Sequence, residues 1–146
     1  WVLLDTGHQE YREVKYQREL LGAVPGARVY RQLQAQKKWC ELGKIDYTIM
    51  TDEVIRANPV FLSNWKFILS NLASTQSIDL SSHIENVVSI LNKSGRGTLR
   101  EIEVSLPTAE QCLIRASIFT LIHRGRLKAA LDEEPLNAST QIDIVS

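Results

Sequence analysis

Apolar and polar side chains change their spacing several times in the first half of the chain. Residues 1–4 are an apolar run, 5–7 carry a turn signal, and 11–16 resume an extended pattern, which together predict a β-hairpin. Apolar side chains then recur at helical spacing over 28–42, and a run rich in β-branched and aromatic residues over 45–50 predicts another strand. Because a helix connects the strands at 11–16 and 45–50, we expect these two strands to be parallel.

Helix signals flank and follow the last of these strands. The helix at 28–42 has Gly43 as its expected end, and one of its faces consists of Val29, Leu33, Gln36 and Cys40. Thr51 is expected to cap a second helix, and Asn58-Pro59 to end that helix and begin a third, in which apolar residues recur at Phe61, Trp65, Ile68 and Leu72. The order strand, strand, helix, strand, helix, helix predicts an α/β domain over residues 1–74.

The second half of the chain is predicted to be a separate and mostly helical domain, residues 75–146. A stretch rich in Ser, Thr and Gln over 73–81 is the expected linker. Capping boxes at Ser82–Glu85, Thr98–Glu101 and Thr108–Gln111 each predict the start of a helix. A short strand is predicted at 127–131, followed by an acidic turn. Three capped helices with a strand-turn tail are typical of a helix-turn-helix with a wing, so we predict a winged-helix domain.

Composition narrows the possible partners and the compartment. The chain has 17 basic and 17 acidic residues, so bulk charge cannot hold DNA, and a local patch or a partner protein must supply that grip. The apolar runs are too short to cross a bilayer and no signal segment is recognisable, so no membrane partner is expected. Cys40 and Cys112 lie far apart and lack the spacing of a zinc site, which favours buried free thiols in a reducing cytoplasm.

Glu13 and Lys15 form the first candidate site. On a strand, positions i and i+2 point to the same face, so a carboxylate and an ammonium are expected side by side. Such a pair suits phosphodiester hydrolysis, in which the carboxylate helps to bind a divalent cation and the lysine offsets the charge that builds up in the transition state. The alternative is a surface salt pair, because Glu-x-Lys is a common tripeptide.

The order of these segments resembles the PD-(D/E)xK nuclease core and, more narrowly, the TnsA family of endonuclease subunits in heteromeric bacterial transposases. The resemblance covers nearly the whole chain. It is carried by Trp1–Gly7, Glu13-Val14-Lys15, Lys37-Lys38-Trp39, Ile49–Ile55, Asn58-Pro59-Val60 and Asn64-Trp65, and in the second half by Thr98–Ile102 and the segment ending at Gly125-Arg126-Leu127.

The resemblance implies a protein that nicks the 5′ ends of a transposon, while an integrase-like subunit cuts and joins the 3′ ends under an ATPase regulator. Glu13 then matches the second metal ligand, which is an acidic or amide side chain in the family, and Lys15 matches the catalytic lysine. The main-chain carbonyl of Val14 is expected to complete the shell around Mg²⁺ or Mn²⁺. An aspartate and a glutamate that the family places further upstream have no counterpart here. We therefore expect an N-terminally incomplete, restriction-endonuclease-like core that is inactive alone. The resemblance also implies a protein of the bacterial cytoplasm that is associated with the nucleoid when it is active.

Two basic features could contact DNA. Lys37 and Lys38, beside Trp39, are predicted to contact phosphates near the cleft, and the alternative is a solvated helix face. The helix after residue 108 is apolar on several sides and has Glu110 in its first turn, whereas a base-reading helix needs polar side chains there. The winged helix is therefore expected to contact protein in preference to reading a DNA sequence.

Two other functions fit the same residues. The zero net charge and the apolar recognition helix suit a non-catalytic adaptor that links a transposase to its ATPase regulator and to DNA. A PD-(D/E)xK nuclease from another DNA-processing system is the third possibility, although the predicted winged helix makes it a weaker match.

Overall fold

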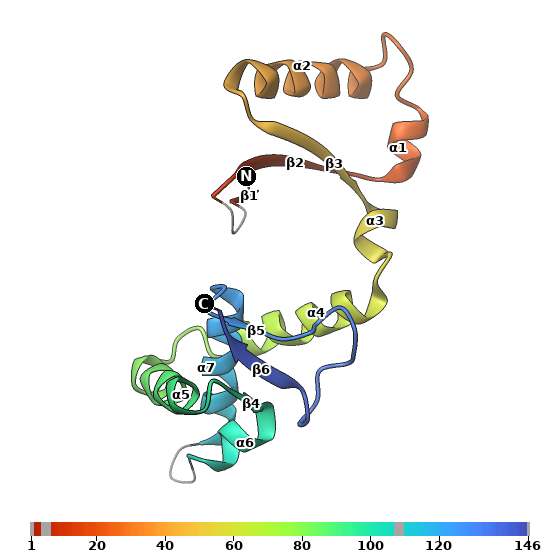
Figure 1. Ribbon diagram of the computed structural model, residues 1–146. Helices are drawn as coiled ribbons and strands as arrows, with labels where there is room; N and C mark the ends of the chain where they lie inside the picture. The colour runs from red at the N-terminus through yellow and green to blue at the C-terminus, as the bar shows by residue number, and fades with distance from the viewer. Residues whose placement is uncertain (1, 4–6, 107–109, 146) are drawn as a thin grey trace. The chain divides into compact units, whose positions relative to one another are not determined.

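The computed structural model describes residues 2–3, 7–106 and 110–145, and the chain divides into two compact units, Trp1–Ala57 and Asn58–Ser146 (Figure 1). This division differs from the boundary predicted between residues 74 and 75. Helix α4 (Pro59–Ser74), which the sequence placed in the first domain, packs against helix α7 (Gln111–His123) of the second unit. Its buried Ile68 lies in the core of that unit, so packing assigns α4 to the second unit.

The first unit is a small sheet with helices at its strand connections. Its elements are β1 (Val2–Leu3), β2 (Gln9–Lys15), α1 (Gln17–Leu21), α2 (Arg28–Gly43), β3 (Asp46–Thr51) and α3 (Asp52–Arg56). The strand order is β1-β2-β3; β1 is antiparallel to β2, and β2 is parallel to β3 with Glu13 opposite Ile49. The predicted hairpin pairing and the predicted parallel pair are thus confirmed, although turn residues 5 and 6 lie outside the described residues.

Helix α2 packs against β3, and contacts between side chains hold the helix and the strands of this unit together. Leu33 and Cys40 are the buried residues of α2, and Tyr11 of β2 stacks on Tyr47 of β3 with 6.0 Å between ring centroids. The helix ends at Gly43 as predicted, but Lys44, with φ of 53°, takes the left-handed conformation after it. Helix α1 falls in a segment for which no helix was predicted.

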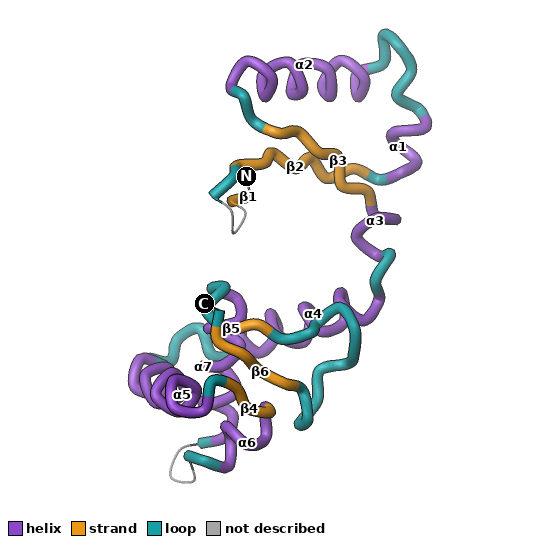
Figure 2. Tube along the Cα trace, in the orientation of Figure 1, coloured by secondary structure: helices purple, strands orange, loops and turns teal. Residues whose placement is uncertain are grey.

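In the second unit the other helices pack around helix α7. This unit contains α4, α5 (Ser81–Ser94), β4 (Arg96–Thr98), α6 (Leu99–Val104), α7, β5 (Leu127–Lys128) and β6 (Gln141–Ile144) (Figure 2). The three short strands form an antiparallel sheet in the order β4-β6-β5. Seven of the thirteen residues of α7 are buried, because α4, α5, α6 and β5 all pack against it. Phe119 at its centre is fully buried and meets Phe67 of α4 edge-on.

The caps show where local sequence determined the helix starts. Thr51, Asn58 and Thr98 accept hydrogen bonds at the starts of α3, α4 and α6, and Thr98 forms the predicted capping box with Glu101. The capping box predicted at Ser82 is wrong. Helix α5 already includes Ser81, because Asp79 accepts from the Ser81 N–H at 2.9 Å and so takes over the role of an acceptor before the helix. The predicted cap Thr108 lies outside the described residues.

Within the described residues the chain is a mixed α/β protein with seven helices and two small sheets. No helix in this part is long and apolar enough to cross a membrane. Both cysteines are free, and Cys40 is buried as predicted. The prediction that Cys112 is buried is wrong, because this residue lies in the exposed first turn of α7.

Candidate functional site

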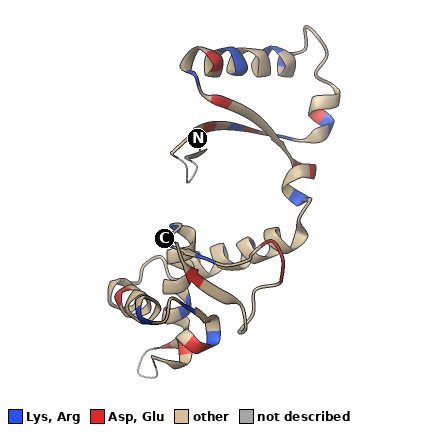
Figure 3. Ribbon diagram, viewed as in Figure 1, with Lys and Arg blue, Asp and Glu red and all other residues tan. Residues whose placement is uncertain are grey.

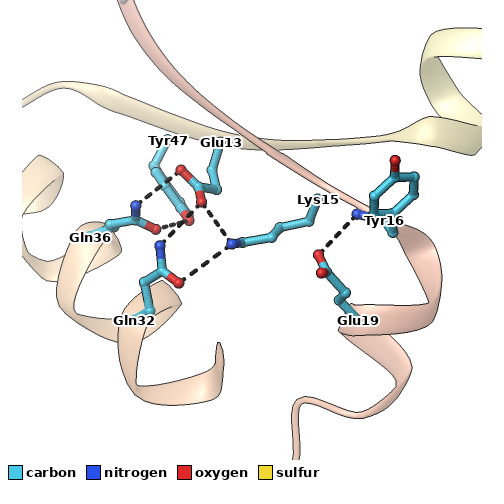
Figure 4. A network of polar contacts seen from close by, with 7 residues as sticks. All are labelled: Glu13, Lys15, Tyr16, Glu19, Gln32, Gln36 and Tyr47. Carbon is cyan, nitrogen blue, oxygen red and sulfur yellow. Dashed lines mark hydrogen bonds and ion pairs between the residues drawn. The ribbon is translucent and has the colours of Figure 1, made fainter. Parts of the chain in front are cut away.

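Glu13 and Lys15 lie on the face of β2 that looks toward α2 (Figure 4). The Lys15 Nζ is 3.2 Å from the Glu13 Oε1, and the two side chains are only 18% and 15% exposed. The predicted side-by-side arrangement is therefore present, and it is more sheltered than an ordinary surface salt pair. A sheltered pair matters chemically because the solvent screens its charges less than those of a surface pair.

Two glutamines of α2 complete this cluster. The Gln36 Nε2 donates to the Glu13 Oε2 at 3.0 Å, and the Gln32 Nε2 lies 3.4 Å from the Glu13 Oε1. The Lys15 Nζ also donates to the Gln32 Oε1 at 3.4 Å. Residues i and i+4 share one side of a helix, which is why both amides reach the same strand. We refer to Glu13, Lys15, Gln32, Gln36 and Tyr47 below as the polar cluster.

Tyr47 of β3 joins the polar cluster from the neighbouring strand. Its hydroxyl donates to the Gln36 Oε1 at 3.2 Å. Burial and then the negative charge of Glu13 raise the pKa of Tyr47 to about 12, so the phenol is neutral at physiological pH. Neither glutamine nor Tyr47 was singled out from the sequence. The available signal was Gln36, a polar residue on the otherwise apolar inner face of the predicted helix.

The described residues do not by themselves make up a metal centre. Glu13 is the only carboxylate of the polar cluster, and no group of three His, Cys, Asp or Glu side chains in the described part of the chain could hold an ion. The side chain of Val14 is a hydrocarbon, so the main-chain carbonyl is the only metal ligand that this residue can offer. These residues therefore offer one anionic ligand, and substrate phosphates, water or further carboxylates would have to supply the rest of the shell around Mg²⁺.

A cavity of about 360 Å³ opens at the carboxyl ends of β2 and β3. Val14, Lys15, Tyr16, Glu19, Asp52, Ile55 and Arg56 line it. The Asp52 carboxylate accepts from the Gln17 N–H at 2.8 Å, which links the starts of α1 and α3. Lys15 thus belongs to the polar cluster and also lines an open cavity, where a ligand could approach it.

Lys37 and Lys38 are both exposed on α2, whose Lys and Arg residues are blue in Figure 3. Adjacent residues of an α-helix point about 100° apart, so the two ammonium groups do not lie on one face. Trp39 contacts Tyr11 edge-on, with 6.3 Å between ring centroids, while 53% of its surface remains exposed. The helix thus offers positive charge on more than one side, beside the strand that bears Glu13 and Lys15.

Helix α7 offers little to DNA. Its Arg115 forms an ion pair with the buried Glu103 of α6, with 2.7 Å between Nε and Oε1. This pairing raises the pKa of Arg115 and occupies its guanidinium group. The central residues of the helix are buried, and α4 packs against it.

Comparison of the chain with protein families, with characterised proteins and with solved structures found no match.

Proposed function

We propose that this chain forms part of a metal-dependent DNA endonuclease of the TnsA type, which nicks transposon DNA at its 5′ ends. The observation that carries the proposal is the sheltered Glu13–Lys15 pair on one face of β2, 3.2 Å apart under α2. A paired carboxylate and ammonium suit the hydrolysis of a phosphodiester, because charge builds up on the phosphate as water attacks.

In this hydrolysis a water oxygen bonds to phosphorus, one P–O bond breaks, and the departing oxygen takes up a proton to become a hydroxyl. The Lys15 ammonium would offset the negative charge on the phosphate oxygens, and the Glu13 carboxylate would accept a hydrogen bond from a water molecule. Mg²⁺ or Mn²⁺ is the cofactor implied by the resemblance, and Glu13 is the carboxylate that the polar cluster offers to it.

The topology of both units supports the same proposal. A hairpin followed by a helical crossover to a parallel strand is the order expected of the second half of a PD-(D/E)xK core. In the second unit, α5-β4-α6-α7-β5-β6 with the sheet order β4-β6-β5 is the order expected of a winged helix. The proposed partners are transposon-end DNA, an integrase-like transposase subunit and an ATPase regulator in the bacterial cytoplasm.

The test is nicking of supercoiled plasmid DNA by the natural polypeptide that contains these residues, together with its transposase partners, in Mg²⁺ or Mn²⁺. Lys15→Ala and Glu13→Ala are each expected to lower the rate by roughly 10²–10³-fold. Glu53→Gln and Lys66→Ala change exposed residues that do not belong to the polar cluster and serve as matched controls. Unchanged cleavage by Lys15→Ala would remove the basis of the proposal.

A second candidate function, a non-catalytic adaptor, is favoured by one observation in the second unit. The helix in the recognition position is largely buried, and the loop that follows β5 carries Asp132, Glu133 and Glu134, all exposed. Acidic side chains repel DNA phosphates, so this unit is better suited to a protein partner. Capture of the regulator ATPase by residues 58–146 would support the adaptor role, and full capture by residues 1–57 alone would contradict it.

A further inference from the structure

The polar cluster contains two bridges that converge on one carboxylate. Gln36 connects Glu13 to Tyr47, with donor–acceptor distances of 3.0 and 3.2 Å. Gln32 connects Glu13 to Lys15, with distances of 3.4 Å on both sides. Because both oxygens of Glu13 are engaged, the plane of its carboxylate is fixed and not merely its position (Figure 4).

The chemistry of the partners determines which way each amide points. An ionised carboxylate only accepts hydrogen bonds and an ammonium only donates them. Gln36 must therefore turn its NH₂ group to Glu13, which leaves its oxygen for Tyr47. A phenol can donate to that oxygen only while it is protonated, and the pKa of Tyr47, raised to about 12, keeps it so.

We infer that Gln36, anchored by Tyr47, is a positioning residue for Glu13 in the nuclease site, an inference that rests on the proposed function. The bond from Gln36 is shorter than those of Gln32 and is partly buried, whereas the bonds of Gln32 are exposed. Gln36 therefore contributes more than Gln32 to the orientation of the Glu13 carboxylate. Tyr47 acts through Gln36 and does not need to touch DNA.

Loss of the hydrogen bond that positions Glu13 should slow the chemical step more than it weakens DNA binding. A carboxylate that turns out of its reactive orientation slows the reaction without changing the contacts that hold the DNA. Gln36→Leu and Tyr47→Phe are expected to lower kcat for plasmid nicking by roughly 10–100-fold, with KM for DNA nearly unchanged. Gln32→Leu should have a smaller effect.

Gln36→Glu separates positioning from a loss of packing. A carboxylate at residue 36 faces that of Glu13 and cannot donate to it, but a protonated carboxyl can. The activity of Gln36→Glu relative to the wild-type chain should therefore be low at neutral pH and rise as the pH falls. A purely structural role for Gln36 predicts instead that the activity of Gln36→Glu follows its folded fraction over the same pH range, which circular dichroism measures.

The experiment uses the natural polypeptide with its partner subunits, plasmid DNA, and two control variants. Gln34→Leu lies on the exposed side of α2, and Tyr30→Phe removes a tyrosine hydroxyl from the same helix, outside both the polar cluster and the cavity lining. Both controls should retain wild-type kcat. Wild-type kcat in Gln36→Leu and Tyr47→Phe, with Glu13→Ala inactive, would overturn this inference and leave the proposed function standing. Activity in Glu13→Ala would instead overturn the proposed function, and this inference with it.

Discussion

The side-chain amide of Asn64 on α4 donates a hydrogen bond of 2.8 Å to the carbonyl oxygen of Leu131, in the loop after β5. The same amide also donates to the Glu134 carbonyl at 2.7 Å, and its oxygen accepts from the Leu136 N–H at 2.8 Å. Asn64 is only 4% exposed. One buried side chain therefore serves three main-chain groups of the loop and ties that loop to α4.

Asn64→Ala is expected to lower the free energy of unfolding by about 2–4 kcal/mol, because it leaves buried main-chain groups without partners. Chemical denaturation measures this loss. Asn71→Ala is the matched control, seven residues later on the same helix. In the described structure the Asn71 Oδ1 is buried and has no hydrogen-bond partner, so this substitution should cost less. An equal loss in both variants would contradict the role of Asn64.

Local signals in the sequence predicted the local structure well. The i, i+2 spacing of Glu13 and Lys15 placed both side chains on one face of β2, and the helix between the strands correctly implied a parallel pair. The capping box at Thr98 formed because both of its partners lie within four residues. The one at Ser82 failed because a nearby competitor, Asp79, could not be ranked against it from sequence alone.

Long-range pairs could not be predicted in the same way. From the sequence, Asn64 cannot be distinguished from any other polar residue of a helix. Its hydrogen-bond partners lie about 70 positions away, in a loop whose sequence has no periodicity. Gln36 was visible as a polar residue on an apolar face, but its two partners come from different strands. The division after Ala57 differs from the boundary predicted between residues 74 and 75, because α4 packs against α7, a helix about 40 positions further along the chain that periodicity alone does not connect to it.

The two predicted capping boxes provide a direct comparison. Thr98→Ala removes the acceptor for the Glu101 N–H and should destabilise the chain by about 1 kcal/mol. Ser82→Ala should change stability little, because Ser82 lies inside α5 and does not cap it. Thermal unfolding of the two variants at the same pH measures the difference. Equal destabilisation by both would mean that Ser82 has a capping role after all.

The titration of Tyr47 reports on the polar cluster without any assay of activity. Glu13→Gln should lower the pKa of Tyr47 from about 12, because it removes the negative charge that opposes the phenolate. The folded state holds this proton more tightly than the unfolded state, whose tyrosine pKa is about 10. Stability from Tyr47 is thus complete below about pH 10 and lost as the pH rises towards about 12.

Ultraviolet absorbance of tyrosinate in the wild-type, Glu13→Gln and Tyr47→Phe chains isolates this transition. Tyr47→Phe should also show a shallower loss of stability over the same alkaline range. An unchanged pKa in Glu13→Gln would mean that Glu13 and Tyr47 are not neighbours in solution.

Arg115 is expected to matter for stability and not for DNA binding. Arg115→Ala leaves the buried Glu103 carboxylate without its cation and should lower the free energy of unfolding by about 1–3 kcal/mol. This loss is smaller than for a fully buried pair, because the Arg115 side chain is 37% exposed and solvent screens its charge. Arg115→Ala combined with Glu103→Gln should recover part of this loss. Chemical denaturation and DNA titration together provide the check, and a fall in DNA affinity without loss of stability would show that α7 contacts DNA.

Lys37 and Lys38 are predicted to contact DNA phosphates from different sides of α2. Each phosphate contact releases a condensed counterion, so the logarithm of the binding constant falls with the logarithm of the salt concentration, by roughly 0.9 per contact. Lys37→Ala and Lys38→Ala should each reduce this slope by about 1, and the double variant by about 2. Lys93→Ala, exposed in the last turn of α5, is the matched control and should leave the slope unchanged. A double variant with the wild-type slope would mean that both lysines belong to a solvated helix face, because only a lysine that displaces a counterion can alter the salt dependence.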